Sequence, residues 1–278
     1  MTSETYSSKG YLAVLATLLI PPVGHVYAGK PLRGLIGFSL IWAFVAAAGW
    51  AGAGHVLWLF YLLYVVFIGG IIALAVDAYR VSSRHKGAVR KWYNHWYVYS
   101  PLAVLFYLVG GLVGENRAYL FGFEPFRIPS STMTPTLQRG DLIAIDSRRY
   151  DGSYVPKRGA VVVFEYPEDR SQDYVKRVIA LPGESFEIVG GDVYINGQML
   201  NEPFLDRELV TQDYSLDFAE VVVPDDAIWV LGDYRDNSRD SRFWGPLKLD
   251  HLVGEVGLIW YAFDFDRIAQ VRPHTFDF

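Results

Sequence analysis

The sequence predicts N-terminal transmembrane α-helices followed by an all-β domain. The residues from Gly34 to Val76 include no Asp, Glu, Lys or Arg, which is typical of a chain that lies in lipid. From about residue 118 the apolar residues instead recur with a period of two, as in short β-strands. We therefore expect a membrane region, residues 1–117, and a β-domain, residues 118–278.

The first apolar segment is marginal as a membrane span. Residues 1–10 are polar, and the segment after them lacks the basic start and small-residue cleavage site of a removable signal peptide. Tyr11–Ala28 is barely long enough to cross a bilayer and is interrupted by Pro21–Pro22. It either crosses with a kink or enters the bilayer and returns, and the side on which residues 1–10 lie depends on that choice.

Two longer apolar runs complete the membrane region. Gly34–Val76 is about twice the ~20 residues that one pass requires, so it predicts two passes joined by the Gly-rich turn Gly49–Gly54. Tyr97–Gly114 is a candidate last pass, which gives three to four transmembrane segments in all. A buried helical pair of a soluble protein would need polar faces, which Gly34–Val76 lacks.

Basic residues set the expected orientation in the membrane. Arg80–Lys91 is rich in Arg and Lys and precedes a cluster of Trp and Tyr that suits a lipid interface. Short basic loops mark the cytoplasmic side of membranes, and the Lys30/Arg33 turn falls on the same side. The sequence therefore predicts a multi-pass protein of the cytoplasmic (inner) membrane, with the lipid bilayer as partner and the β-domain on the extracytoplasmic, or periplasmic, side.

Composition excludes several kinds of function. The net charge of -5 leaves no basic surface for nucleic acid. The chain has no cysteine, which excludes disulfides, a thiolate nucleophile and cysteine-ligated zinc. Hydrophobic residues make up 51% of the chain and are concentrated in its N-terminal part, in agreement with a membrane region.

The β-domain is predicted from short apolar runs separated by turn signals. The turns are Gly190–Gly191, Asn196–Gly197 and Pro224–Asp225. Evenly spaced strands without a long helix favour a sandwich or barrel. The predicted strands are Leu142–Asp146, Ala160–Tyr166, Tyr174–Ala180, Ser185–Val189, Asp192–Asn196, Phe218–Val223, Ile228–Leu231 and Leu252–Phe263.

A hydroxyl cluster lies at the start of the β-domain, between Pro129 and Pro135. Proline fixes φ and favours an extended residue before it, so this stretch cannot be helix interior. The cluster is either an ordinary polar turn or a rigid turn that presents a nucleophile to a cleft. Its members are Ser130, Ser131, Thr132 and Thr134.

Lys176 lies within an apolar strand of the β-domain. Because strand side chains alternate between faces, Lys176 and Arg177 point oppositely, and one of them faces the less polar side. Lys176 is either a lysine that protects an edge strand from aggregation or a desolvated lysine. Burial lowers the pKa of an amine, and a neutral amine can act as a general base.

The loop 232–245 is dense in charge. It is either a solvated surface loop or a set of ion pairs that supports a catalytic lysine. Its aspartates also suggest a metal site, but the interleaved arginines would repel a cation, so no metal is predicted. The charged residues are Asp233, Arg235, Asp236, Arg239, Asp240 and Arg242.

Together these stretches closely resemble the type I signal peptidase (leader peptidase) family. The resemblance spans about Phe121 to Gly257, with its motifs in order and correctly spaced. The motifs are Glu124–Ser130, Met133, Pro135–Leu137, Gly140–Asp141, Arg158–Gly159, Val161–Asp169, Tyr174–Arg177, Leu181–Gly183 and the 232–245 loop. The resemblance implies a signal-peptidase-like all-β catalytic domain outside the cytoplasm, a serine–lysine dyad, signal peptides of exported preproteins as substrates, and no metal or other cofactor.

Carried over by position, the resemblance assigns a role to each site residue. Lys176 is the general base, Ser130 supplies the oxyanion-hole hydroxyl, and Thr132 falls at the nucleophile position. Ser238 would orient the lysine, with support from Asp233, Asp240 and Arg242. The implied pocket for small substrate side chains comprises Phe126, Ile128, Pro129, Met133, Leu137, Val163, Tyr174 and Val175.

The nucleophile position departs from the family, which has serine there. Threonine keeps the hydroxyl but adds a methyl group that restricts χ1 beside the base and the scissile carbonyl. Three interpretations follow: Thr132 is a working nucleophile, Ser131 or Ser130 replaces it after a change of register, or the dyad is impaired. Smaller departures are Tyr234 for asparagine and Ala160 for aspartate.

We therefore expect a membrane-bound endopeptidase that cleaves N-terminal signal peptides through a hydroxyl/lysine dyad. The alternative is an impaired homologue that binds signal-peptide-like segments without cutting them. A self-cleaving repressor shares the dyad chemistry but would need a DNA-binding domain where residues 11–114 predict membrane helices. A transporter would place charges within its membrane segments, and the predicted segments have none.

Overall fold

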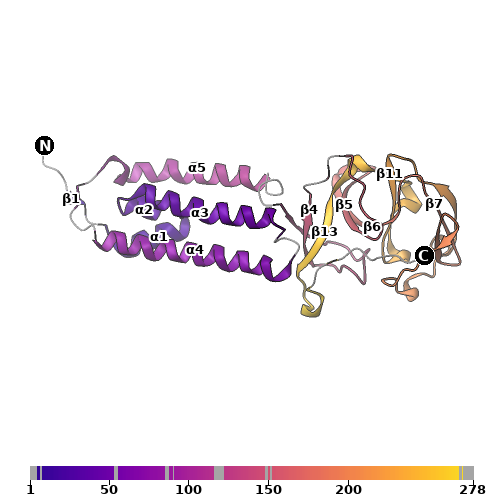
Figure 1. The fold of residues 1–278 in the computed structure, drawn as a ribbon. Coiled ribbons are helices and arrows are strands. Elements are labelled where there is room, and N and C mark those ends of the chain that lie inside the picture. The colour runs from indigo at the N-terminus through magenta and orange to yellow at the C-terminus, as the bar shows by residue number, and fades with distance from the viewer. Residues whose placement is uncertain are drawn as a thin grey trace. The chain divides into compact units, whose positions relative to one another are not determined.

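The computed structural model describes residues 5–6, 8–52, 56–84, 88–89, 91–115, 122–147, 150, 152–268 and 271. The chain divides into two compact units, a helical unit within residues 1–121 and a β unit formed mainly by residues 122–278 (Figure 1). Apolar helices followed by antiparallel sheets confirm the predicted fold class.

The first apolar segment of the helical unit reverses its direction. It forms α1 (Gly10–Leu19) and the short α2 (Val23–Tyr27), joined at Pro21–Pro22. A Cβ atom on Gly24 would lie 1.8 Å from Thr17 Oγ1, so α2 folds back against α1 and tolerates only glycine there. The ten residues of α1 extend about 15 Å, half of a bilayer's hydrocarbon core.

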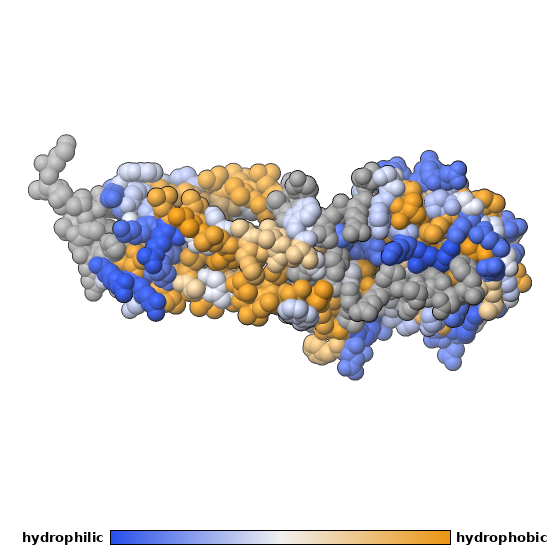
Figure 2. All heavy atoms as spheres, in the orientation of Figure 1, coloured by the Kyte–Doolittle hydropathy of each residue, from blue (hydrophilic) through white to orange (hydrophobic). Residues whose placement is uncertain are grey.

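Three long helices form the rest of the helical unit and lie side by side (Figure 1). They are α3 (Pro31–Trp50), α4 (Leu57–Arg84) and α5 (Trp96–Glu115), which contains Pro101. Of the described helices, α3 and α4 are long and apolar enough to cross a membrane, and the apolar part of α5, Tyr97–Val113, is shorter. Figure 2 shows hydrophobic residues along this unit and hydrophilic residues at one end.

A short strand pair ties the N-terminal segment to the connection between α4 and α5. Strand β1 (Thr5–Tyr6) pairs antiparallel with β2 (Ala88–Val89), a pairing that sequence periodicity did not predict. Residues 5–6 therefore lie at the end of the helical unit where α4 ends and α5 begins. Parts of the predicted turn Gly49–Gly54 and of the basic segment Arg80–Lys91, as well as Phe121, lie outside the described residues.

A polar cluster joins three helices of this unit. The Arg33 guanidinium donates two hydrogen bonds of 2.7 Å to the Asp77 carboxylate, and His25 Nε2 lies 3.0 Å from Asp77 Oδ2. His25 is fully buried on α2. Asp77, the first charged residue after the long apolar run, is thus paired, as charges in apolar helical bundles generally are.

The β unit consists of two antiparallel sheets. The larger sheet has the order β12-β11-β6-β5-β13-β4-β3, and the smaller has the order β10-β7-β8-β9. The strands are β3 (Glu124–Arg127), β4 (Leu142–Asp146), β5 (Val161–Tyr166), β6 (Asp169–Ala180), β7 (Ser185–Val189), β8 (Asp192–Ile195), β9 (Gln198–Met199), β10 (Phe218–Val222), β11 (Ala227–Leu231), β12 (Leu247–Lys248) and β13 (Leu252–Tyr261).

Both faces of strand β5 are covered by apolar side chains. Val161 and Val163 belong to a cluster with Met133, Leu137 and residues of β4 and β13. Val162 and Phe164 belong to a second cluster on the opposite face, with residues of β6, β11 and β12. This double burial explains the unbroken apolar run of β5 and fixes the strand on which β6 is aligned.

Strand β6 begins at Asp169, earlier than the predicted start at Tyr174. Tyr166 of β5 pairs with Asp169, so the two strands form a continuous hairpin through polar residues that carry no apolar alternation. Short strands β9 and β12 were likewise not predicted, because two residues cannot display a period.

Leu137→Ala should destabilise the β unit by about 2–5 kcal/mol, because Leu137 is fully buried and its truncation leaves a cavity. Val222→Ala is the control, because Val222 is 70% exposed and its truncation should cost less than about 0.5 kcal/mol. Urea unfolding of the purified chain, followed by tryptophan fluorescence, measures both. Equal midpoints for the two variants would contradict the position of Leu137 in the core.

Candidate active site

The hydroxyl cluster lies on a tight turn after β3. The Thr134 amide donates to the Ser131 carbonyl at 3.1 Å, and the Leu137 amide donates to the Met133 carbonyl at 2.8 Å. Met133 and Leu137 anchor the turn in the apolar core, and Arg267 donates to the Thr136 carbonyl while it pairs with Asp141. The turn is therefore held by packing in the core on one side and by hydrogen bonds from Arg267 on the other.

Lys176 and Thr132 are in contact. The Lys176 ammonium nitrogen lies 3.1 Å from Thr132 Oγ1, and it also donates to the Val175 carbonyl at 2.9 Å. The two residues are 44 positions apart in the sequence, and the pairing of Lys176 with Val162 of β5 holds the lysine beside the turn. A hydroxyl and an amine at hydrogen-bond distance are the arrangement that nucleophilic catalysis requires.

Burial makes Lys176 a candidate base. Lys176 is 2% exposed, and desolvation lowers its pKa to about 8, although the negative charges of Asp240 and Asp233 act in the opposite direction. The edge-strand interpretation of this lysine is wrong, because β6 lies between β5 and β11 in the sheet. A substantial fraction of Lys176 is thus neutral near pH 8 and can accept a proton.

Two possible oxyanion donors lie at the same turn. Ser130 Oγ is 3.3 Å from Thr132 Oγ1, so the two hydroxyls face the same small space. Within the described part of the chain, the Thr132 amide N–H has no hydrogen-bond acceptor. The hydroxyl and the amide are both available to an oxygen atom that gains negative charge.

Ser238 is buried close to the turn. A Cβ atom on Gly232 would lie 2.1 Å from Ser238 Oγ and 2.7 Å from the Thr132 carbonyl oxygen, so the glycine allows the serine and the turn to approach. Among the residues that the structure describes, Ser238 Oγ has no hydrogen-bond partner. Its predicted role in orienting Lys176 remains a prediction.

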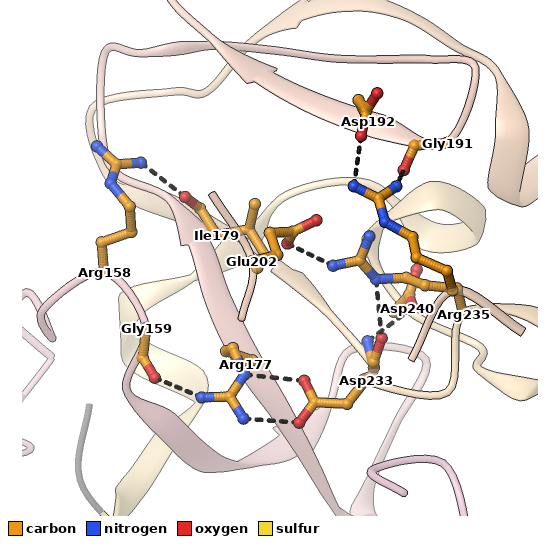
Figure 3. A network of polar contacts seen from close by, with 12 residues as sticks. Arg158, Gly159, Arg177, Ile179, Gly191, Asp192, Glu202, Asp233, Arg235 and Asp240 are labelled. Atoms are coloured by element: carbon orange, nitrogen blue, oxygen red, sulfur yellow. Dashed lines mark hydrogen bonds and ion pairs between the residues drawn. The ribbon is translucent and has the colours of Figure 1, made fainter. Parts of the chain in front are cut away.

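The charged loop is largely buried, so the interpretation as a solvated surface loop is wrong. Arg177 donates to both carboxylate oxygens of Asp233, at 2.8 and 2.6 Å, and to the Gly159 carbonyl at 2.8 Å (Figure 3). Arg242 donates to both oxygens of Asp240, at 2.8 and 2.9 Å. These two pairs are at most 1% exposed.

Asp233 and Asp240 of this loop are thus committed to arginines. Asp240 also accepts from the Gly232 amide at 2.9 Å and caps helix α8 (Ser241–Trp244). Asp236 accepts from the backbone of Thr211 and Gln212. Within the described ranges no group of three His, Cys, Asp or Glu side chains could hold a metal ion.

A pocket of about 220 Å³ opens beside Thr132 and Lys176. Five residues of the predicted substrate pocket line it, namely Ile128, Pro129, Met133, Tyr174 and Val175. The other three, Phe126, Leu137 and Val163, are not among its lining residues. They pack in the apolar core instead, with Leu137 and Val163 fully buried.

The family model described as signal peptidase, peptidase S26, matches residues 101–261. The chain belongs to the signal peptidase family. This membership confirms the resemblance found in the motifs and makes the chain a hydrolase of the serine-protease type.

Several curated relatives carry the same family name. The chain is 37% identical over 163 residues to the probable signal peptidase I-1 of a Synechocystis strain, which covers 56% of this chain and 79% of the relative. It is 38% identical over 160 residues to signal peptidase I of Leptolyngbya laminosa, and this match covers 55% of this chain and 75% of the relative. A solved signal peptidase I structure from Enterococcus faecalis shows 33% identity with a TM-score of 0.34, covering 37% of this chain and 97% of that one.

Two pocket residues of this signal peptidase family member were missed by sequence reasoning. Asp173 and Arg239 line the pocket with Thr132 and Lys176. Arg239 directly follows Ser238, and Asp173 precedes Tyr174, so adjacency to predicted site residues was the signal that could have found them. Arg239 pairs with Glu168 at 2.8 Å, and burial raises the pKa of the Asp173 carboxyl.

Asp233→Asn should destabilise the β unit by about 3–5 kcal/mol, because it leaves the Arg177 guanidinium buried without a counter-charge. Asp192→Asn removes the partner of Arg207 in an exposed ion pair and should cost at most about 1 kcal/mol. Thermal unfolding of both variants measures the difference. A loss at Asp233 no larger than the loss at Asp192 would show that the buried pair does not support the site.

Proposed function

We propose that the chain is a membrane-bound endopeptidase that removes N-terminal signal peptides from exported preproteins, with Thr132 as nucleophile and Lys176 as base. The observation that carries the proposal is the 3.1 Å contact between Thr132 Oγ1 and a buried lysine whose pKa is lowered to about 8. Relatives named signal peptidase I supply the substrate class.

The proposed reaction has two stages. Neutral Lys176 accepts the Thr132 hydroxyl proton as Oγ1 attacks the carbonyl carbon of the scissile bond, and the protonated lysine then donates that proton to the leaving amine. Ser130 and the Thr132 amide donate to the oxyanion, a contribution typically worth several kcal/mol. Lys176 then activates a water molecule, which hydrolyses the threonyl ester and releases the acid product.

The pocket suits small side chains. It is about 220 Å³ and is walled by Ile128, Met133 and Val175, with Thr132 and Lys176 beside it. Signal-peptide cleavage sites are preceded by small residues, which such a pocket accommodates. Proposed roles at this site are positioning by Ser238 and support of the lysine's surroundings by Asp233, Asp240 and Arg242.

We further propose three full membrane passes, α3, α4 and α5, with α1 and α2 as a segment that enters and returns. The pairing of β1 with β2 supports this count, because it brings the N-terminal segment to the end where α4 meets α5. Three passes from the cytoplasmic side would place residues 118–278 outside the cytoplasm. The basic loops predict the same orientation.

Replacing Thr132 tests the nucleophile. With a preprotein substrate in detergent, Thr132→Ala and Lys176→Met should abolish cleavage, whereas Thr132→Ser should retain it or raise it, because the hydroxyl remains and the methyl group is removed. Ser131→Ala is the matched control in the same turn and should cleave like the unmodified chain. Cleavage is measured by gel shift and by mass of the released peptide.

The same set separates the alternatives. Cleavage that appears only in Thr132→Ser would make the natural chain a binding protein with an impaired dyad. Cleavage that survives Thr132→Ala and disappears in Ser131→Ala would move the nucleophile to Ser131. Either result overturns the proposed role of Thr132.

The rate should follow deprotonation of Lys176. Because only the neutral amine accepts the hydroxyl proton, kcat/KM should rise about tenfold per pH unit below pH 8 and level off above about 8, the pKa of Lys176. Initial rates between pH 6 and about 10 measure this profile. A plateau reached only above about pH 10, the ordinary range of lysine, would contradict a desolvated base.

A further inference from the structure

An apolar groove lies within the helical unit, far in sequence from the proposed active-site residues. It encloses about 580 Å³ between α2, α3, α5 and the turn at Trp92–Asn94. Its walls include Val26, Leu35, Phe38, Trp92, Leu102 and Phe106. Phe38 of α3 and Phe106 of α5 meet with ring centroids 6.0 Å apart, so they join the two long walls.

The rim of the groove is fixed by hydrogen bonds. The Tyr93 hydroxyl donates to the Gly29 carbonyl at 3.2 Å, and the Asn94 side chain donates to the Val26 carbonyl at 3.0 Å. These contacts tie the turn before α5 to the turn before α3. Residues 29–31 and 91–93 therefore lie together at one end of the groove.

That end carries two positive charges. Lys91 places its ammonium 5.8 Å from the centre of the Tyr93 ring, and Lys30 is exposed directly before α3. Within the described residues no carboxylate pairs with either lysine, whereas the neighbouring Arg33 is already paired with Asp77. Helix α3 also begins there without a side-chain cap, so its N-terminal amides add positive potential.

We propose that this groove binds one anionic phospholipid, with an acyl chain between α3 and α5 and the phosphate near Lys30, Lys91 and the start of α3. The apolar walls fit an acyl chain, and the charges at the rim fit an anionic headgroup. The beginning of a signal peptide is positively charged, so the same rim would repel it. The inference rests on the proposed insertion of the helical unit into a bilayer.

The binding can be measured by native mass spectrometry of the full chain in detergent. Phosphatidylglycerol and phosphatidylcholine with identical acyl chains are added separately. We expect one retained phosphatidylglycerol per chain and at least about tenfold weaker retention of phosphatidylcholine, since each lysine near an anionic headgroup strengthens binding roughly fivefold. Equal retention of the two lipids would overturn the charge-selective site.

Variants locate the lipid. Lys30→Gln combined with Lys91→Gln should weaken phosphatidylglycerol binding about 25-fold and leave phosphatidylcholine unchanged. Leu35→Trp, which fills the groove, should remove phosphatidylglycerol. Leu40→Trp is the matched control, because Leu40 is on the same helix, is 66% exposed and does not line the groove. Equal binding by Leu35→Trp and Leu40→Trp would place the lipid elsewhere.

Three further readouts separate this inference from the proposed function. A synthetic signal peptide that displaces the bound lipid from the unmodified chain would assign the groove to substrate and overturn the lipid site. Preprotein cleavage is measured on the same samples. A chain that cleaves the preprotein but binds phosphatidylglycerol no better than phosphatidylcholine would count against the lipid site alone. Release of the chain from membranes by a carbonate wash would count against membrane insertion.

Discussion

The contact between Thr132 and a desolvated Lys176 is the constraint on which the proposed chemistry depends. A lysine exposed to water would be protonated at neutral pH and could not accept a proton. Burial within the β unit lowers its pKa to about 8, and the alignment of β6 on β5 directs it to the turn that carries Thr132. The apolar residues on both faces of β5 are thus a condition of the chemistry as well as of the fold.

The buried ion pairs adjust this constraint. The negative charges of Asp240 and Asp233 raise the pKa of Lys176, and the positive charge of Arg242 lowers it. Because the two aspartates are paired with arginines, they attract the protonated lysine less strongly than unpaired carboxylates would. Each carboxylate meets an arginine through two hydrogen bonds, which fixes the loop and the position of Gly232 beside Thr132. The charged residues of the 232–245 loop therefore hold the loop in place beside Thr132. Of this loop, Arg239 lines the pocket and the other charged residues do not.

The long apolar runs without charged residues were sufficient to predict the long helices, and the period-two recurrence of apolar residues predicted most strands. The sequence left open whether the first apolar segment crosses or returns, and the structure shows α2 folded back against α1. The pairing of β1 with β2 was not predicted, because it depends on contacts between distant residues. The same limit applies to the site: the Thr132–Lys176 contact was expected from family motifs and not from a pattern. The pocket was likewise assigned from the family motifs by position: it included Leu137 and Val163, which lie in the apolar core, and omitted Asp173 and Arg239, which line the pocket.

The most direct test of the central claim is the pKa of Lys176 itself, measured without turnover. Carbon-13 labelling of lysine Cε allows the resonance to be titrated by NMR in detergent, and the Lys176→Met spectrum identifies it. We expect a midpoint of about 8. A midpoint near 10.4, the value of a solvated lysine, would contradict the account, because Lys176 would then be a cation where the mechanism requires a neutral amine.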